Sequence, residues 1–385
     1  MSGSEGEFKS PFVPSIPLFQ RGIFLPGFLT PLCKEGKGRF GKRGRNKVRV
    51  RLPESFFMIV TGVNFFFSVM LPSVATGGDK LVALYSSHAV PYSTPWVAEE
   101  LGLFNKYDLD FDFVYIPSSS TATAAILGGN VEVGLLGGVG VVNAFVSGAS
   151  DLVFIGSFKN IMTQSILAKP EVSKLQDLRG KKIGVTRIGS NTHYFSVQAL
   201  RRAGMSPEKD ITFIQTGGDM ETLGALFSGA IDAATLLPPT DGRAIARGFR
   251  YVVYGPDLSI PYAAATITTR RSVVAKRGQV IARFMRAMAD ASRLMHRDKE
   301  FAYKVLQKKL RINDRSVLET GYATEIKVME PRLEIKAQAI QTIIEEAQKT
   351  NPRAADIKPQ DLVDRRYLAE METSGFFNQI WSDKR

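Results

Sequence analysis

The chain has 385 residues, which is enough for two domains of ordinary size and excludes a single small domain. Hydrophobic residues make up 44% of it and charged residues 23%, so the chain can bury a sizeable core and is not disordered throughout. Lysine and arginine number 50 against 37 aspartates and glutamates, and this net charge of +13 raises nucleic acids and membranes as partners.

The basic excess is concentrated at the start of the chain. Residues 1–75 carry a net charge of +7, and the densest run, 37–51, holds eight basic residues and no acid. An uncharged apolar stretch follows at 55–78 and contains the small residues Ser73 and Ala75. This order is typical of a secretory signal cleaved after Ala75. An uncleaved membrane helix is the alternative, whereas a nucleic-acid site is disfavoured because the basic run precedes an export signal.

The apolar stretch begins unusually late, because a secretory signal normally occupies roughly the first 15–30 residues. A native start near 48–58 is therefore expected. We predict that 1–54 is a spurious or disordered N-terminal extension and that 55–75 is a signal peptide. The only cysteine, Cys33, lies in this leader, so residues 76–385 contain no thiol nucleophile, disulfide or cysteine metal site.

Strands and helices alternate from residue 80 onward. In chain order, we expect strands at 81–85, 111–116, 131–136 and 151–155, with helices at 94–103, up to 127 and at 141–146. The pattern restarts at residue 164, with a helix at 172–178 and strands at 165–168, 182–185, 211–214, 231–236, 250–253 and 263–268. After residue 268 the chain is expected to be helical. Such β-α-β units predict two mostly parallel sheets with helices on both faces.

Four phrases carry a family resemblance, and they lie at 96–104, 127–134, 175–185 and 228–234. In order and spacing they resemble the periplasmic substrate-binding proteins of the nitrate, alkanesulfonate, taurine and thiamine-pyrimidine group of ABC importers. The resemblance implies an α/β fold of type 2: a two-lobed clamshell, each lobe a mostly parallel sheet flanked by helices, with C-terminal helices. It places lobe 1 at 79–157 plus 262–385 and lobe 2 at 158–261, with hinge crossings near 156–157 and 260–262.

The function that this resemblance implies is capture of a small anionic or aromatic organic solute between the lobes. The partners would then be the solute and the permease and ATPase of an ABC importer, for a periplasmic monomer without cofactor or nucleic acid. Contact with a membrane would come only through the permease or an uncleaved signal. A membrane-anchored or sensory receptor is one alternative. An enzyme is another, but related pyrimidine synthases use a cysteine-rich motif that residues 76–385 lack, so no catalysis is expected.

Candidate ligand-binding residues follow from the rule that open α/β sheets bind ligands beyond the carboxyl ends of their strands, beside helix N-termini. The candidates in lobe 1 are Ser87, His88, Tyr92, Trp96, Ser118, Ser119, Ser120, Thr121 and Gly138. Those in lobe 2 are Arg187, Ser190, Asn191, Thr192 and Pro239. No catalytic or metal-binding residue is expected.

Some of these candidates also have structural explanations. The hydroxyls of 118–121 could simply cap a helix, and Trp96 could be a core residue. Arg187 is the strongest candidate for pairing with an anionic group, because its guanidinium matches carboxylates and sulfonates. A surface ion pair is its alternative role.

Overall fold

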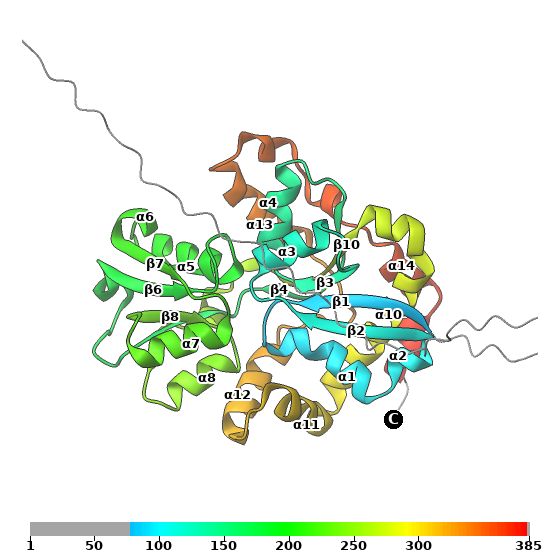
Figure 1. Ribbon diagram of the computed structural model, residues 1–385, viewed down its shortest axis with the longest axis horizontal. Coiled ribbons are helices and arrows are strands. Elements are labelled where there is room, and N and C mark those ends of the chain that lie inside the picture. Colours follow the sequence, from blue (N-terminus) through cyan, green and yellow to red (C-terminus); the bar gives the residue numbers. More distant parts are fainter. Residues whose placement is uncertain (1–77, 383–385) are drawn as a thin grey trace, which may run out of the picture. The chain divides into compact units, whose positions relative to one another are not determined.

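The computed structural model describes residues 78–382, and its two five-stranded sheets are the centres of two lobes (Figure 1). The predicted N-terminal extension (1–54) and signal peptide (55–75) lie outside the described residues. Within the described part, none of the helices combines the length and apolar character that crossing a bilayer requires.

The first sheet has the strand order β2-β1-β3-β10-β4. Its strands are β1 (Asp79–Tyr85), β2 (Leu109–Tyr115), β3 (Val133–Leu136), β4 (Leu152–Ile161) and β10 (Pro261–Arg270). Only β10 is reversed, since it pairs antiparallel with both β3 and β4 while β1 is parallel to β2 and β3. The first sheet is therefore mostly parallel, as predicted.

The second sheet repeats this arrangement with the order β7-β6-β8-β5-β9. Its strands are β5 (Ser165–Ala168), β6 (Lys181–Val185), β7 (Ile211–Gln215), β8 (Ala233–Leu236) and β9 (Arg250–Val253). Here β5 is the reversed strand, paired antiparallel with β8 and β9. The predicted fold class, two mostly parallel sheets with flanking helices, is confirmed.

Helices flank both sheets. Those before β5 or after β10 are α1 (Thr94–Glu100), α2 (Leu103–Lys106), α3 (Ser119–Leu127), α4 (Gly138–Val146), α10 (Arg271–Arg297), α11 (Lys299–Leu310), α12 (Arg315–Ile326), α13 (Ala337–Gln348), α14 (Arg366–Thr373) and α15 (Phe376–Ser382). Those between β5 and β10 are α5 (Asn191–Arg202), α6 (Pro207–Asp210), α7 (Asp219–Ser228), α8 (Thr240–Ile245) and α9 (Gly255–Leu258). Single 3₁₀ turns lie at Val90–Ser93, Leu175–Leu178, Pro352–Asp356 and Pro359–Leu362.

Two predicted helices are shorter than expected. The helix predicted at 94–103 divides into α1 and α2 because Gly102 adopts a left-handed conformation, with φ of 65°. The helix predicted at 172–178 is reduced to the 3₁₀ turn Leu175–Leu178. Each change shortens a helix and leaves the order of the strands as expected.

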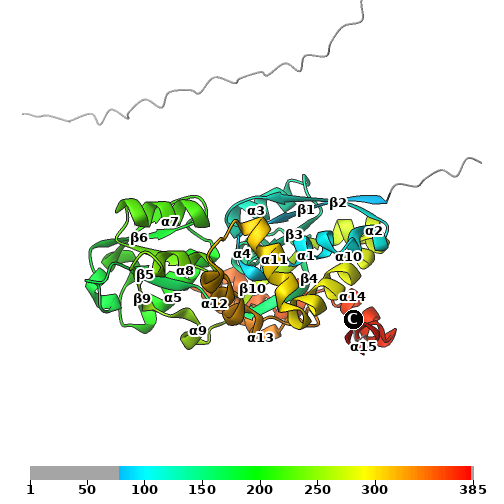
Figure 2. The same ribbon diagram turned by 90° about the horizontal axis from the view of Figure 1, so that it is seen from below.

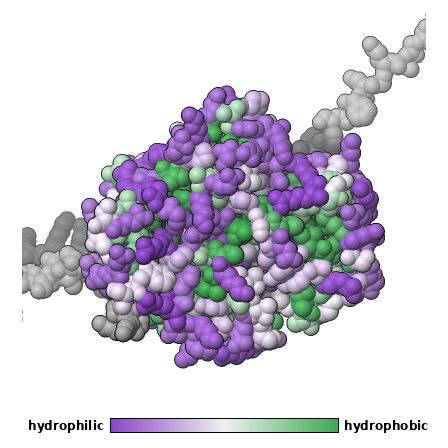
Figure 3. Space-filling model, turned by 180° about the vertical axis from the view of Figure 1, so that it is seen from behind, coloured by the Kyte–Doolittle hydropathy of each residue, from purple (hydrophilic) through white to green (hydrophobic). Residues whose placement is uncertain are grey.

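The core of the first lobe lies on both faces of its sheet, because alternate side chains of β1 point to opposite faces. Leu81, Ala83 and Tyr85 pack with α1 and α10, whereas Leu84 packs with α3, α4 and α13. Figure 1 shows these two groups of helices on opposite sides of the sheet. Figure 3 shows the molecule from behind relative to Figure 1, and hydrophilic residues cover most of this surface, with hydrophobic patches between them.

The two sheets are joined by two short connections. β4 continues through the predicted crossing at 156–157 to Ile161, because it pairs with β10 along this length. The chain therefore passes to the second sheet at 162–164 and returns at 259–260. The C-terminal part also reaches the second lobe, since α12 packs against α8 (Figures 1 and 2).

A buried ion pair lies beside the first connection. The Lys159 ammonium on β4 is 2.6 Å from the Glu325 carboxylate on α12, and both side chains are at most 1% exposed. Lys159 also donates to the Thr163 hydroxyl at 2.6 Å, and that hydroxyl donates to Glu325. Buried charges are tolerated only when they are paired and hydrogen-bonded, so this triad ties α12 to the connection between the sheets.

Replacing Lys159 by methionine should lower the free energy of unfolding by about 3–5 kcal/mol, because it leaves the Glu325 charge buried without a partner. Urea titration followed by circular dichroism measures this change. The exposed pair Arg315–Glu319 provides the control, since solvent screens it and Arg315→Ala should change stability far less than Lys159→Met. A Lys159→Met protein as stable as the control variant would show that the pair does not hold this region together.

Candidate functional site

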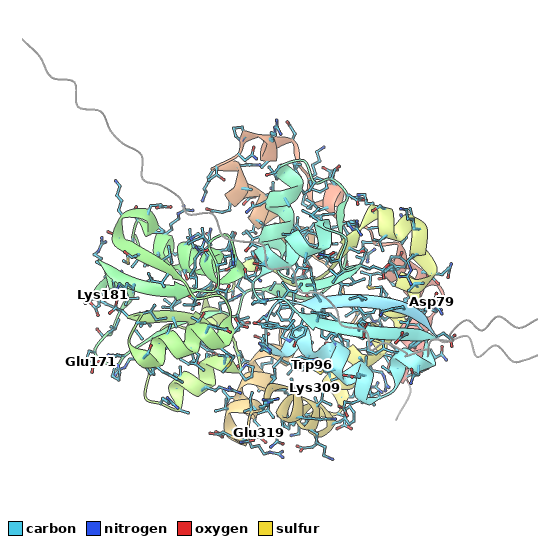
Figure 4. The ribbon with its side chains drawn as sticks, viewed as in Figure 1. Asp79, Trp96, Glu171, Lys181, Lys309 and Glu319 are labelled. Atoms are coloured by element: carbon cyan, nitrogen blue, oxygen red, sulfur yellow. The ribbon has the colours of Figure 1, made fainter. Side chains whose placement is uncertain are left out.

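The carboxyl ends of strands from both sheets meet at one small cavity, here called the inner cavity. Its volume is about 20 Å³, and its lining residues are Ser86, Ser87, Tyr92, Ser118, Ser119, Thr186, Asn191, Thr192, Asp219 and Leu237. Figure 4 shows the side chains of both lobes filling the space between the sheets. A volume of this size holds about one water molecule, so the lobes are closed on each other in this structure.

Direct hydrogen bonds join the lobes beside the inner cavity. Asp219, the first residue of α7, accepts the Ser87 hydroxyl at 2.6 Å and the His88 backbone N–H at 3.1 Å. Asp219 is 4% exposed, and this burial raises the pKa of its carboxyl group, while the two hydrogen bonds act in the opposite direction. Asp219 of the second lobe thus accepts hydrogen bonds from two donors in the loop that follows β1 of the first lobe.

Asn191, the first residue of α5, makes the second set of contacts between the lobes. Its Oδ1 atom accepts the hydroxyls of Ser119 at 3.2 Å and Tyr262 at 2.6 Å, and its Nδ2 atom donates to the Ala264 carbonyl at 3.3 Å. The Tyr262 hydroxyl in turn accepts the backbone N–H of Val139 at 3.0 Å. The side-chain amide is therefore held by three groups of the first sheet and its loops.

Three hydroxyls organise the loop that enters α5. The Thr186 hydroxyl lies 3.0 Å from both the Ser190 and Thr192 hydroxyls, and its backbone N–H donates to Thr192 Oγ1. Ser190 also caps α5 by accepting the backbone N–H of His193. The loop is thus fixed locally before any contact with the other lobe.

Several predicted site residues line the inner cavity: Ser87, Tyr92, Ser118, Ser119, Asn191 and Thr192. Ser118 occupies the N-cap position of α3, but its hydroxyl lies 2.9 Å from the Ser120 hydroxyl and makes no capping hydrogen bond. Thr121 is half-buried in α3, and Ser190 is buried with its hydroxyl 3.0 Å from that of Thr192, which lines the cavity. Gly138 begins α4 close to the Ala263 side chain.

Other predicted residues lie elsewhere. Trp96, labelled in Figure 4, is 7% exposed and packs edge-on against Tyr85 with ring centroids 5.1 Å apart, as a core residue does. Arg187 is exposed and does not line the inner cavity. His88 and Pro239 line a second, larger pocket of about 380 Å³, here called the outer pocket. A ligand contact by any of these residues stays a prediction.

Five residues that line the cavity or contact its lining were not among the predicted ones: Ser86, Thr186, Asp219, Leu237 and Tyr262. The strand-end rule applies to Asp219, because it follows β7 and begins α7, so its position was detectable from the sequence. Tyr262 lies on the returning strand β10, and only the closed sheet brings it to the loops. Among residues 78–382, no group of three or more His, Cys, Asp or Glu side chains is arranged to hold a metal ion.

Gly137 sets how closely the lobes approach. A Cβ atom there would lie about 2 Å from the side-chain atoms of Asn191, whose amide is held by the hydrogen bonds described above. The backbone φ of Gly137 is −85°, which alanine adopts without strain. Only a glycine therefore allows α5 to pack this closely against the loop before α4.

Gly137→Ala should hold the lobes apart, because the new methyl group collides with Asn191. Small-angle X-ray scattering would then give a larger radius of gyration for the variant than for the wild type. Gly224→Ala is the matched control, since a Cβ atom at that helical glycine meets nothing within 4 Å. Identical scattering from both variants would contradict this role of Gly137.

Burial also affects Asp241 in the first turn of α8. It raises the pKa of that carboxyl group from 3.8 to about 6, although the Tyr251 hydroxyl and the Gly242 backbone N–H donate to it. The unfolded carboxyl group titrates near 3.8, so its contribution to stability is complete below that pH and is lost as the pH rises through about 6.

Wild type should therefore lose about 3 kcal/mol of unfolding free energy relative to Asp241→Asn between pH 4 and pH 7, since one pKa unit corresponds to about 1.4 kcal/mol. Denaturant titrations of both proteins at several pH values measure this difference. If the two curves stay parallel over this range, Asp241 does not titrate in this way.

The comparisons with known proteins agree with this geometry. A family model described as "NMT1/THI5 like" matches residues 91–302. A Brucella abortus protein, named as a candidate binding protein, is 27% identical over 258 residues, which are 65% of this chain and 77% of that protein.

Solved structures share the fold at lower identity. The alkanesulfonate-binding protein SsuA from Xanthomonas axonopodis pv. citri, bound to MOPS, has a TM-score of 0.62 at 21% identity, covering 74% of this chain and 98% of its own. The desulfurization enzyme DSZB has a TM-score of 0.58 at 14% identity, covering 77% and 99%. Binding proteins and an enzyme thus share this architecture. With more than half of its length matched, the chain belongs to the NMT1/THI5-like family and has the two-lobed periplasmic binding-protein fold.

Proposed function

We propose that this protein is the solute receptor of an ABC importer and captures a small organic solute between its lobes in the periplasm. The observation that carries the proposal is the inner cavity, to which both lobes contribute polar groups at the carboxyl ends of their strands. Closure around a ligand that contacts both lobes traps it, and an open form can then load or release it.

The helix N-termini around the inner cavity favour a ligand with hydrogen-bond acceptors. The helices α3, α4, α5 and α7 all begin at this edge of the sheets. Their first backbone N–H groups have no partner within the helix and lie at the positive end of the helix dipole. Acceptor groups of a solute are suited to this position, and hydroxyls such as that of Ser119 add donors.

Uptake of a solute requires the lobes to part, because the inner cavity holds about one water molecule. Parting breaks the contacts of Asp219 with Ser87 and His88 and those of Asn191 with Ser119, Tyr262 and the Ala264 carbonyl. Water can replace each of these hydrogen bonds in an open form at modest cost. A solute that supplies equivalent hydrogen bonds would shift the population toward a ligand-filled closed form.

An enzymatic role on the same scaffold, as in DSZB, has less support. The Ser87 hydroxyl donates to the Asp219 carboxylate and not to the His88 ring, whose buried Nδ1 atom has no hydrogen-bond partner among the described residues. The inner cavity thus lacks a paired hydroxyl and imidazole of the kind that activates a serine nucleophile. No cysteine follows residue 33.

A thermal-shift screen of alkanesulfonates, nitrate, aromatic acids and pyrimidines tests the proposal. A true ligand should stabilise the protein by mass action, by about 2.7 kcal/mol at a concentration of 100 times its Kd. Nuclear magnetic resonance of the mixture should show the ligand unchanged after prolonged incubation. Steady consumption of the ligand would instead identify an enzyme.

Two variants locate the binding site of any such ligand. Ser119→Ala removes a hydroxyl from the inner cavity and should weaken binding several-fold, as loss of one hydrogen bond does. Ser228→Ala removes an exposed hydroxyl at the far end of α7 and should leave the Kd unchanged. Equal binding by the two variants would place the ligand outside the inner cavity.

A further inference from the structure

The outer pocket is a separate feature from the inner cavity, and it is formed by three parts of the chain. Its lining residues are His88, Met220, Pro239, Thr240, Arg243, Lys309, Leu310, Arg311 and Ile312. They come from the loop after β1, from α7 and α8 of the second lobe, and from the end of α11. The volume of about 380 Å³ is sufficient for a small organic molecule without any opening of the lobes.

Three cationic side chains line this pocket, and two of them lack an acidic partner. Lys309 pairs with Glu99 at 2.6 Å. Arg243 and Arg311 form no ion pair with any residue in the described part of the chain. The acidic side chains nearest His88, those of Asp219 and Glu221, lie on α7 and are not among the lining residues of the pocket. The lining of the pocket therefore holds three cationic side chains and no acidic one.

The guanidinium group of Arg243 is held in place by backbone groups. Its Nη2 atom donates to the carbonyl oxygens of Leu310 at 2.9 Å and Arg311 at 3.3 Å, at the end of α11. Its Nη1 atom lies 3.6 Å from the sulfur of Met220, which is a weak acceptor. These contacts fix the orientation of the side chain and leave N–H donors without a strong acceptor. Partial burial lowers the pKa of Arg243, as expected for a cation that no anion compensates.

The remaining walls of the outer pocket are apolar or neutral. Leu310 and Ile312 are buried, and the exposed Met220 on α7 adds a further apolar side chain to the lining. Thr240 adds a hydroxyl group. A ligand that suits these walls has one anionic group for the guanidinium and a short apolar body.

We propose that the outer pocket is a binding site for a small organic acid, a carboxylate or sulfonate with a short apolar body, whose anionic group is held by Arg243. Arginine suits this task because its planar fork matches both oxyanions through two parallel hydrogen bonds. The site goes beyond the solute capture proposed above, since it lies outside the inner cavity and exists while the lobes are closed.

Isothermal titration of the full chain with benzenesulfonate and with benzoate tests this proposal. Benzenesulfonamide has nearly the same shape without the charge and should bind at least tenfold more weakly. Arg243→Gln should weaken binding of both acids by about tenfold or more, because it removes a charge-assisted hydrogen bond. Lys308→Gln is the matched control, since Lys308 pairs with Glu100 and does not line the pocket.

A second variant separates binding from folding, because Arg243 also contacts the end of α11. The Arg311 side chain is exposed, so Arg311→Gln should leave the melting temperature unchanged. It should weaken binding of the two acids several-fold, because it removes a nearby positive charge. Unchanged binding by Arg243→Gln, or equal binding of the sulfonamide, would overturn the proposal. So would binding that Ser119→Ala abolishes and Arg243→Gln does not, although that result would support solute capture in the inner cavity.

Discussion

The pairing of β10 with β3 and β4 is the constraint on which the rest of the molecule depends. The chain leaves the first sheet after β4, builds the whole second sheet, and returns as β10 between β3 and β4. The first sheet is thus complete only when the chain returns from the second lobe, and a hydrogen bond from the Met162 N–H to the Ile260 carbonyl joins the two connections. This arrangement points the carboxyl ends of strands from both sheets at one another and so creates the inner cavity.

The inner cavity shows how the closed lobes satisfy each other's polar groups. Buried hydroxyls, amides and carboxylates are costly without partners, and Asp219 and Asn191 supply those partners across the boundary between the lobes. The same groups become available to a solute when the lobes separate. A receptor of this kind needs contacts that hold the lobes closed but can still be exchanged for contacts with water or a solute. Hydrogen bonds that are neutral or involve a single charge meet this need.

The outer pocket follows from the path of the C-terminal helices. α12 packs against α8 and is tied to β4 by the buried pair of Lys159 and Glu325. This packing brings the end of α11 to the side of α8, where its carbonyl groups orient Arg243. The guanidinium of Arg243 is thus oriented by backbone groups more than 60 residues away along the chain.

Much of the fold and part of the candidate site could be predicted from the sequence. The spacing of apolar residues, with strand and helix periods in turn, predicted the order of the strands. The loops that follow these strands contain residues that line the inner cavity: Ser87, Ser118, Ser119, Asn191 and Thr192. These predictions succeeded because they depend on local patterns and on the general rule that strand ends of a parallel sheet share an edge.

The tertiary structure alone decided which charged groups lie at the cleft. Arg187 follows a strand as the rule requires, yet it is exposed, whereas Arg243 gains its position from the end of α11. Asp219 and Tyr262 are likewise brought to the cavity by contacts between distant elements. The sequence by itself determined the secondary structure, the two mostly parallel sheets and the polar loops, because these follow from local periodicity. The partners of each side chain across the cleft were decided by long-range packing, which no local pattern records.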